Sequence, residues 1–197
     1  MRIGLLGPGE DEALFREAAT FLLGDAGAEQ VVYLGDGAFL EDATSRWARE
    51  LGVSTEDAFL THALDVAMSG GAEDVDRLLA RDALTSRLAH IRKLPPPPAR
   101  AIELIDERVV VFVHDKAVLD EEDIANAAVV VYGRSTEAGV RRFGKRLFVT
   151  PGPLEGRRVG MIEDEDAGAF VSLVDLSGHA LLREALAAGS TKLTVAG

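Results

Sequence analysis

Val31-Val32-Tyr33-Leu34-Gly35-Asp36-Gly37 is the stretch of sequence that decides the fold. Its apolar and aromatic residues run directly into Gly-Asp-Gly, which predicts a short buried strand ending in a loop that presents one carboxylate. In an open α/β sheet, ligands bind just beyond the carboxyl ends of the strands. Asp36 is therefore the first candidate for a functional side chain, although Gly-Asp-Gly is also typical of a plain turn.

The residues before this stretch predict a strand and a helix that lead into it. Residues 3–6 are apolar, Gly7-Pro8-Gly9 is a turn, and the acidic residues 10–12 suit the first turn of a helix that runs to about residue 23. Strand, helix and strand in this order predict a βαβ unit with two parallel strands and a right-handed crossover.

Residues 39–94 have a helical pattern, and we expect no strand among them. Three helices are predicted, at about 41–51, from an N-cap at Ser54-Thr55 to about 68, and at 72–92. The run Leu94-Pro95-Pro96-Pro97-Pro98 must be extended, because proline lacks the amide donor and restricts the residue before it. We therefore expect one domain over residues 1–197, with a helical insertion at about 39–94 and a stiff connector after it.

The remaining residues have the pattern of strands and hairpins. Strands are predicted at 101–105, 109–113, 127–132, 140–143, 146–150, 157–162 and 169–176, with a short helix at 120–126. Residues 163–166 form an acidic segment that we interpret as a solvated loop, and residues 180–188 suit either a helix or an edge strand. The whole pattern predicts an α/β fold with mixed sheets.

Composition excludes several classes of function. The net charge of −12 argues against a nucleic-acid or anionic-membrane partner, which needs clustered Lys and Arg. The absence of cysteine excludes disulfides and a thiol nucleophile. No apolar run approaches the roughly 18 residues of a membrane-spanning helix, and residues 1–6 do not resemble a signal peptide, so we expect a cytoplasmic protein.

The order of the strand ends resembles the calcineurin-like metallophosphoesterases. Four apolar strands end in polar loops that begin at Gly7, Gly35, His114 and Gly133. The family reads Asp-x-His, Gly-Asp, Gly-Asn-x-(Asp or His), a lone His and Gly-His-x-His, often followed by Asn-Pro-Gly-Ser. The pattern is most similar to the small bacterial phosphodiesterases that share their fold with the cargo-binding subunit of retromer. The resemblance covers residues 1–37 and about 101–178, and it implies a four-layer αββα sandwich with mixed sheets.

The resemblance carries over only part of the family's metal site. Asp36 stands at the place of the metal-bridging Asp, and His114 at the place of the lone His ligand. Pro8 and Glu10 stand where the first motif has Asp and His.

Other motifs are also replaced. Arg134 and Thr136 stand where the Gly-His-x-His motif has its two histidines. Residues 150–153, Thr-Pro-Gly-Pro, are similar to Asn-Pro-Gly-Ser, and no Gly-Asn motif is found.

These replacements matter because a two-metal phosphoesterase site needs carboxylates and neutral imidazoles that converge on two ions. Asp36 and His114 alone cannot hold two metals. Arg134 would bring a permanent positive charge to a metal position, because a guanidinium does not lose its proton. We interpret Arg134 as a replacement for a metal that pairs with Asp36; the alternative is that Arg134 points to solvent.

Three functions remain open. The first is a non-catalytic binding or scaffold protein with a protein partner, no cofactor, and a vestigial site of Asp36, His114 and Arg134. The second is a metal-dependent phosphoesterase with one rebuilt site for Mn²⁺ or another divalent ion, held by Glu10, Asp36 and His114, with Asp115 nearby. The third is phosphate or nucleotide binding without catalysis at the amides of residues 7–9.

Basic residues gather in one part of this acidic chain. Three pairs form the cluster: Arg141-Arg142, Lys145-Arg146 and Arg157-Arg158. They lie on or near predicted hairpins, where they serve either as a solvated sheet edge that blocks aggregation or as a surface for an acidic partner.

Overall fold

The computed structural model describes residues 1–51, 56–166 and 168–186. They form two compact units, one of Met1–Asp36 with Lys93–Gly197 and the other of Gly37–Arg92. The expected N-cap at Ser54-Thr55 and the end of the predicted 180–188 segment lie outside the described residues. No described helix is long and apolar enough to cross a membrane.

The first unit contains most of one mixed sheet, in the order β11-β10-β9-β1-β2. Its elements, with helix α1, are β1 (Arg2–Leu6), α1 (Glu12–Leu23), β2 (Gln30–Tyr33), β9 (Arg158–Glu165), β10 (Gly168–Asp175) and β11 (Ala180–Ala185). β1 and β2 are parallel, with Leu5 opposite Val32, as the predicted βαβ unit requires. β9 pairs antiparallel with β1, and β10 with β9 and β11. The tail of ambiguous pattern is therefore an edge strand over residues 180–185.

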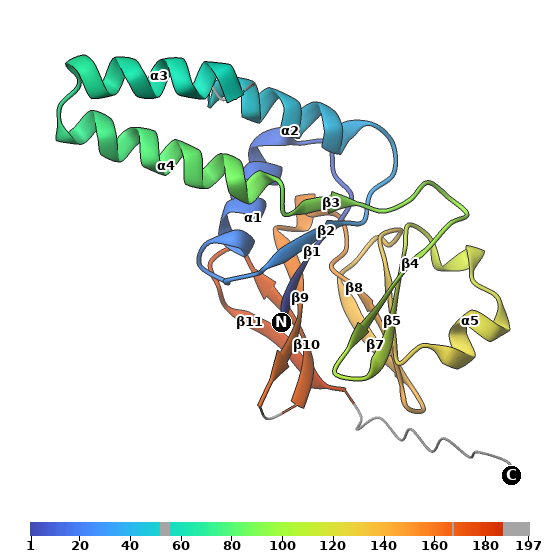
Figure 1. The fold of residues 1–197 in the computed structure, drawn as a ribbon. Helices are drawn as coiled ribbons and strands as arrows, with labels where there is room; N and C mark the ends of the chain where they lie inside the picture. Colours follow the sequence, from blue (N-terminus) through green and yellow to red (C-terminus); the bar gives the residue numbers. More distant parts are fainter. Residues whose placement is uncertain (52–55, 167, 187–197) are drawn as a thin grey trace, which may run out of the picture. The chain divides into compact units, whose positions relative to one another are not determined.

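A second mixed sheet, in the order β4-β5-β6-β8-β7, completes this unit (Figure 1). Its strands and short helices are β4 (Ala101–Ile105), β5 (Arg108–Val113), η1 (Lys116–Val118), α5 (Glu121–Asn126), β6 (Val129–Tyr132), β7 (Gly139–Phe143), β8 (Arg146–Thr150) and η2 (Leu154–Gly156). The central strands β5, β6 and β8 run parallel, and the outer strands β4 and β7 run antiparallel to their neighbours. Every strand predicted in this region is confirmed.

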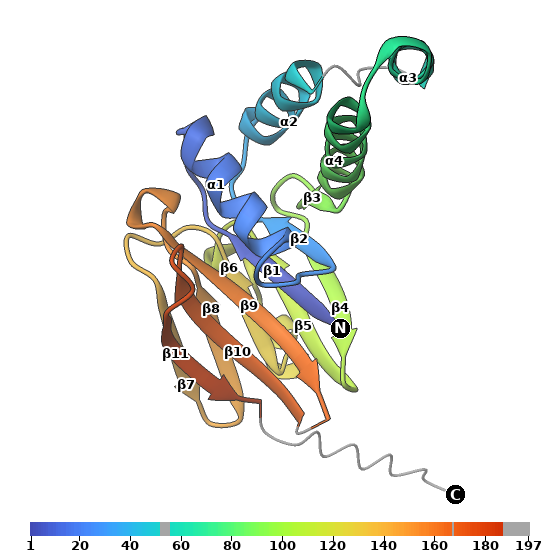
Figure 2. The same cartoon turned by 90° about the vertical axis from the view of Figure 1, so that its left-hand side faces the viewer.

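The two sheets pack face to face, with α1 on the outer side of the first sheet (Figure 2) and α5 beside the second (Figure 1). Leu5 and Val32 of the first sheet share one buried cluster with Phe112 and Val131 of the second. On the outer side of the first sheet, α1 buries an apolar face that includes Phe15, whose ring meets the Tyr33 ring edge to face at 6.3 Å.

On the outer side of the second sheet, Val111 and Tyr132 pack with Ala127, which follows α5. The carboxylates of Asp120 and Asp123 cap the first turn of α5, as the acidic start of the predicted helix requires. The order α1, sheet, sheet, α5 is the predicted αββα arrangement.

The second unit consists of α2 (Phe39–Glu50), α3 (Glu56–Ser69) and α4 (Ala72–Leu88). α4 contacts both other helices. Our expectation that residues 39–94 hold no strand is wrong, because α4 ends at Leu88 and β3 (Ile91–Lys93), the sixth strand of the first sheet, follows across the boundary between the units. Leu84, Leu88 and Ile91 continue the helical spacing, and three residues are too few to show a strand period.

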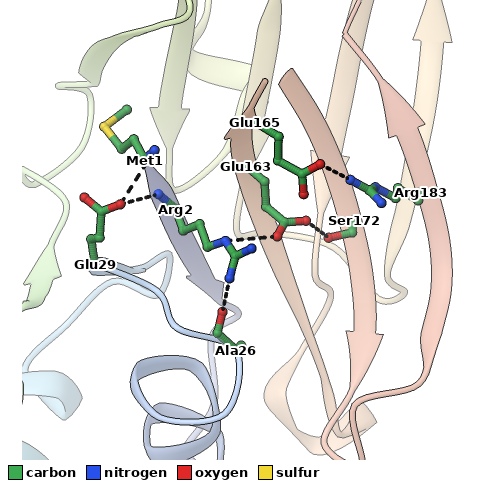
Figure 3. A network of polar contacts seen from close by, with 8 residues as sticks. All are labelled: Met1, Arg2, Ala26, Glu29, Glu163, Glu165, Ser172 and Arg183. Atoms are coloured by element: carbon green, nitrogen blue, oxygen red, sulfur yellow. Dashed lines mark hydrogen bonds and ion pairs between the residues drawn. The ribbon is translucent and has the colours of Figure 1, made fainter. Parts of the chain in front are cut away.

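The acidic segment 163–166 is also corrected, because residues up to Glu165 belong to β9. Figure 3 shows why these carboxylates are tolerated in a strand. Glu163 accepts from Arg2 Nε at 3.5 Å and from the Ser172 hydroxyl at 3.4 Å, and Glu165 pairs with Arg183 at 2.9 Å. Partners from neighbouring strands offset the charge that made the segment look like a loop.

Gly7 provides a test of the packing at the end of β1. A Cβ atom at Gly7 would overlap the carbonyl oxygen of Gly152. We expect Gly7→Ala to lower the free energy of unfolding by about 2 kcal/mol or more, since a backbone segment must move to admit the methyl group. Urea unfolding measures this, with Gly139→Ala as the matched control, because a Cβ there meets nothing within 4 Å. Equal stability of the two variants would contradict the close approach.

Candidate functional site

The carboxyl ends of β1, β2, β5 and β6 meet at one cleft of about 570 Å³. Its lining contains the three predicted vestigial residues together with Asp115: Pro8, Leu34, Gly35, Asp36, Pro97, His114, Asp115, Val118 and Arg134. The sequence therefore located the cleft by the strand-end rule. Glu10, the further candidate ligand, is not among the lining residues.

His114 is the most buried of the charged and polar side chains that line the cleft. It follows β5, is only 6% exposed, and places Nδ1 3.0 Å from the Leu34 carbonyl oxygen and Nε2 3.1 Å from the Pro95 carbonyl oxygen. A carbonyl oxygen only accepts and a neutral imidazole has a single N–H, so the neutral ring donates to one of these two oxygens at a time. A metal ligand needs a free ring nitrogen, and here both nitrogens face protein acceptors.

Arg134 lies at the rim of the cleft. Its guanidinium Nη1 pairs with Asp115 Oδ2 at 3.1 Å, and its side chain is 82% exposed. The pairing with Asp36 that we expected is not among the ion pairs of the described residues. An exposed pair of this kind contributes little to stability. The backbone N–H of Arg134 donates to the His114 carbonyl oxygen at 2.7 Å, so the end of β6 is tied to the end of β5.

Asp36 is exposed in the loop after β2. Within the described part of the chain, its carboxylate makes no hydrogen bond or ion pair. The backbone of this loop passes close to Tyr33 at Gly35, because a Cβ atom at Gly35 would overlap the Tyr33 ring. Within the described residues, Asp36 is thus an unpaired carboxylate. Asp115, the other acid of the cleft, is paired with Arg134.

The loop after β1 uses its own amides. Gly9 N–H points to the Tyr33 hydroxyl at 3.4 Å, and this hydroxyl donates to the Gly9 carbonyl oxygen at 3.2 Å. Glu10 N–H donates to Glu155 Oε1 at 3.3 Å.

The start of α1 is closed in the same way. The Asp11 carboxylate accepts from the N–H groups of Ala13 and Leu14 at 2.9 and 3.1 Å. Of the amides of residues 7–9 that were predicted to hold a phosphate, Pro8 has no N–H and the Gly9 N–H is already bonded, as are the N–H groups at the start of α1.

Burial raises the pKa of Tyr33 above its ordinary value of 10.0. The hydrogen bond with Gly9 acts in the opposite direction, and the nearby charges of Asp36, Glu155 and Glu10 raise the pKa further. The neutral phenol is therefore the form that holds the first loop.

The residues of the cleft do not fit a two-metal phosphoesterase centre. Such a centre needs several carboxylates and free imidazole nitrogens around each ion. The cleft offers the carboxylates of Asp36 and Asp115, the latter bound to Arg134, and a histidine whose two ring nitrogens both lie beside backbone carbonyl oxygens. Over the described ranges there is no group of three His, Asp or Glu side chains that is placed to hold a metal.

Comparison with solved structures identifies the fold. No protein-family profile matches the chain, and no curated protein matches it in sequence. The structure is similar to a conserved, predicted phosphoesterase of Streptococcus pneumoniae, with 13% identity, a TM-score of 0.52, and 93% of this chain and 95% of that one covered. It is also similar to the phosphoesterase YfcE of E. coli, with 12% identity, a TM-score of 0.52, and 95% and 100% covered.

A third similar structure is wild-type Vps29 of Entamoeba histolytica, complexed with zinc. It has 13% identity, a TM-score of 0.50, and 95% of this chain and 100% of that one covered. The chain therefore has the calcineurin-like metallophosphoesterase fold that the sequence pattern predicted. Identities this low define the fold and leave the activity open.

Two functional contacts were not predicted from the sequence. The proline run was interpreted only as a connector, whereas the Pro95 carbonyl accepts a hydrogen bond from His114. Tyr33 was interpreted as a strand residue, whereas its hydroxyl holds the Gly9 backbone. A backbone carbonyl leaves no signal in the sequence, but a Tyr among valines in a buried strand is a sign that its hydroxyl has a partner.

The contacts of His114 predict a structural contribution from this side chain. We expect His114→Ala to lower the free energy of unfolding by about 2 kcal/mol, because the change removes a buried side chain that donates to a backbone carbonyl group at the strand ends. Asp36→Ala, which removes an exposed and unbonded carboxylate, is expected to change it by less than about 0.5 kcal/mol. Urea unfolding of both variants measures the contrast, and a stability loss confined to Asp36→Ala would contradict this account.

The raised pKa of Tyr33 predicts a dependence of stability on pH. The unfolded chain ionises Tyr33 near pH 10.0 and the folded protein at a higher pH, so stability from the neutral phenol is present below pH 10.0 and lost as the pH rises beyond it. We expect wild type to exceed Tyr33→Phe in unfolding free energy by about 1 kcal/mol near neutral pH. This difference should shrink above pH 10.0, because other groups titrate equally in both proteins. A difference that stays constant with pH would refute the assignment.

Proposed function

We propose that this protein is a non-catalytic binding or scaffold protein built on the metallophosphoesterase fold. The observation that carries the proposal is His114, whose two ring nitrogens face the carbonyl oxygens of Leu34 and Pro95. The side chain that stands at the place of a metal ligand acts as a structural donor between strand ends.

The other strand ends support the same conclusion. Pro8 has no donor atom for a metal, and Arg134 is a permanent cation at the rim of the cleft. Arg134 neutralises Asp115, one of the two carboxylates of the cleft. Removing ligands and adding a cation both weaken the attraction of a divalent ion.

The fold itself is compatible with this function. Similar structures include a phosphoesterase of E. coli and the Vps29 protein, so the same framework occurs under different names and roles. The Entamoeba Vps29 was obtained with zinc, which makes metal binding the decisive property to measure in this chain.

Metal binding and phosphodiester hydrolysis test the proposal together. The wild-type protein, purified without chelator, is analysed for bound Mn, Zn, Fe and Ni and then titrated with Mn²⁺ and Zn²⁺ by calorimetry. Bis(p-nitrophenyl) phosphate serves as the diester substrate. We expect no metal binding that depends on Asp36 and no metal-stimulated hydrolysis.

The matched variants are Asp36→Ala and Asp25→Ala, which each remove one exposed aspartate of the same unit. Stoichiometric metal that is lost in Asp36→Ala and retained in Asp25→Ala would overturn the proposal. The rebuilt one-metal phosphoesterase site would then replace it.

A further inference from the structure

The outer face of the second sheet carries a groove that is separate from the strand-end cleft. It has a volume of about 380 Å³ and an almost entirely apolar floor. The floor comes from α5, β6, β7 and β8: Ile124, Tyr132, Phe143 and Phe148. Phe143 and Phe148 meet edge to face with ring centroids 5.4 Å apart. Phe143 remains 59% exposed, so the groove offers aromatic surface to a partner.

Three cations line the same groove. Strand register places Arg141 opposite Phe148 and Arg146 opposite Phe143, so cations and rings alternate across β7 and β8. From the other side, Lys116 Nζ lies 4.5 Å from the centroid of the Tyr132 ring. No acidic side chain is among the lining residues.

These cations lack the partners that most other arginines of the protein have. Arg142 and Arg157, from the same basic pairs in the sequence, bind Glu184 and Glu17. Arg146 donates only to the Ala125 carbonyl oxygen, at 3.0 Å. Among the described residues, no carboxylate pairs with Lys116, Arg141 or Arg146, in a chain with 33 acidic and 21 basic residues.

Protection of the sheet edge does not account for this arrangement. Edge protection places charges on the outermost strand, which is β7. Lys116 and Arg146 are not part of that strand, because Lys116 lies on η1 and Arg146 on β8, the next strand inward. Phe143, an exposed ring on the edge strand itself, would favour aggregation rather than prevent it.

We propose that this groove binds an acidic peptide segment of a partner protein through one aromatic or large apolar anchor side chain. The anchor fits the apolar floor, and carboxylates on either side of it meet Lys116 across from Arg141 and Arg146. Besides the Tyr132 hydroxyl, the cations are the only polar groups among the lining residues, which suits a segment with several carboxylates better than a small ligand held in one orientation. A short acidic segment contacts only the groove. A nucleic acid or an anionic membrane would also face the rest of the surface, where the net charge of −12 repels it.

This inference names a class of partner for the proposed binding function, and it rests on that proposed function. The groove lies on α5, β6, β7 and β8, and the metal titration above reports on the strand-end cleft. Each experiment can therefore contradict its own proposal without contradicting the other.

Fluorescence anisotropy tests the groove with three labelled ten-residue probes. The first has one central Phe flanked by Asp and Glu, the second replaces that Phe with Ala, and the third replaces the acids with Asn and Gln. We expect the first probe to bind wild type at least about tenfold more tightly than either of the others, with affinity that falls as salt rises.

Variants of the protein locate the binding. Arg141→Glu is expected to weaken the first probe about tenfold or more, whereas Arg158→Glu, the same charge change at another exposed arginine, changes it little. Phe143→Ala is expected to weaken it at least about tenfold, and Leu181→Ala, at a side chain 52% exposed on β11, serves as its control. Urea unfolding checks that all four variants fold.

The proposal is overturned if the first probe binds more weakly than about 1 mM, or if the groove variants behave as their controls do. Tighter binding of a single-stranded oligonucleotide or of phosphatidylserine vesicles, lost in Arg141→Glu, would assign the groove to another class of ligand and would equally overturn it.

Discussion

The close approach of the two sheets at their carboxyl edge is the constraint on which the rest of the first unit depends. The Leu34 carbonyl oxygen, just past β2, accepts from His114 beyond β5. A Cβ atom at Gly133, just past β6, would overlap this same oxygen. One backbone group of the first sheet thus contacts two strand ends of the second, and it does so where a buried carbonyl requires a donor. The cleft lies where these strand ends meet, and residues just beyond them form much of its lining.

This constraint explains why the framework does not depend on the exposed side chains that line the cleft. The inner faces of the sheets are apolar from β1 to β8, and their burial supplies the main driving force for packing. His114 adds a hydrogen bond from a ring N–H to the Leu34 or the Pro95 carbonyl oxygen, and this contact needs no metal. Asp36 and Arg134 lie outside this junction and are exposed, so substitutions there leave the sheets in place.

The sequence predicted the fold well because its signals were local. Apolar runs of four to six residues, followed by Gly or polar loops, identified the strands of both sheets, and the acidic first turn of α5 identified a helix of only six residues. The pattern failed where the tertiary partner decides the structure. Ile91–Lys93 forms a strand despite continuing a helical spacing, and Glu163 and Glu165 lie in a strand because Arg2 and Arg183 are beside them.

The position of the candidate site in the fold was predictable from the sequence, whereas the contacts of its side chains were not. Strand order brings Asp36, His114 and Arg134 to one cleft, and this follows from the sequence once the strands are known. The partner of each side chain depends on distances of a few ångströms across loops. Arg134 therefore pairs with Asp115, 19 residues away in the chain, and not with the Asp36 that motif position suggested.

The cleft and the groove of the first unit differ in how their charges are compensated. In the cleft, the cation Arg134 has an acidic neighbour, so the local charges compensate within the protein. In the groove, Lys116, Arg141 and Arg146 stand beside aromatic rings, which attract a cation but leave its charge uncompensated. Lys116 contacts the Tyr132 ring and Arg146 donates to the Ala125 carbonyl oxygen, but among the described residues none of the three cations has a carboxylate partner. The electrostatic and apolar contacts that the fold leaves unused lie together at the groove, and this is the combination that the proposed acidic segment would supply.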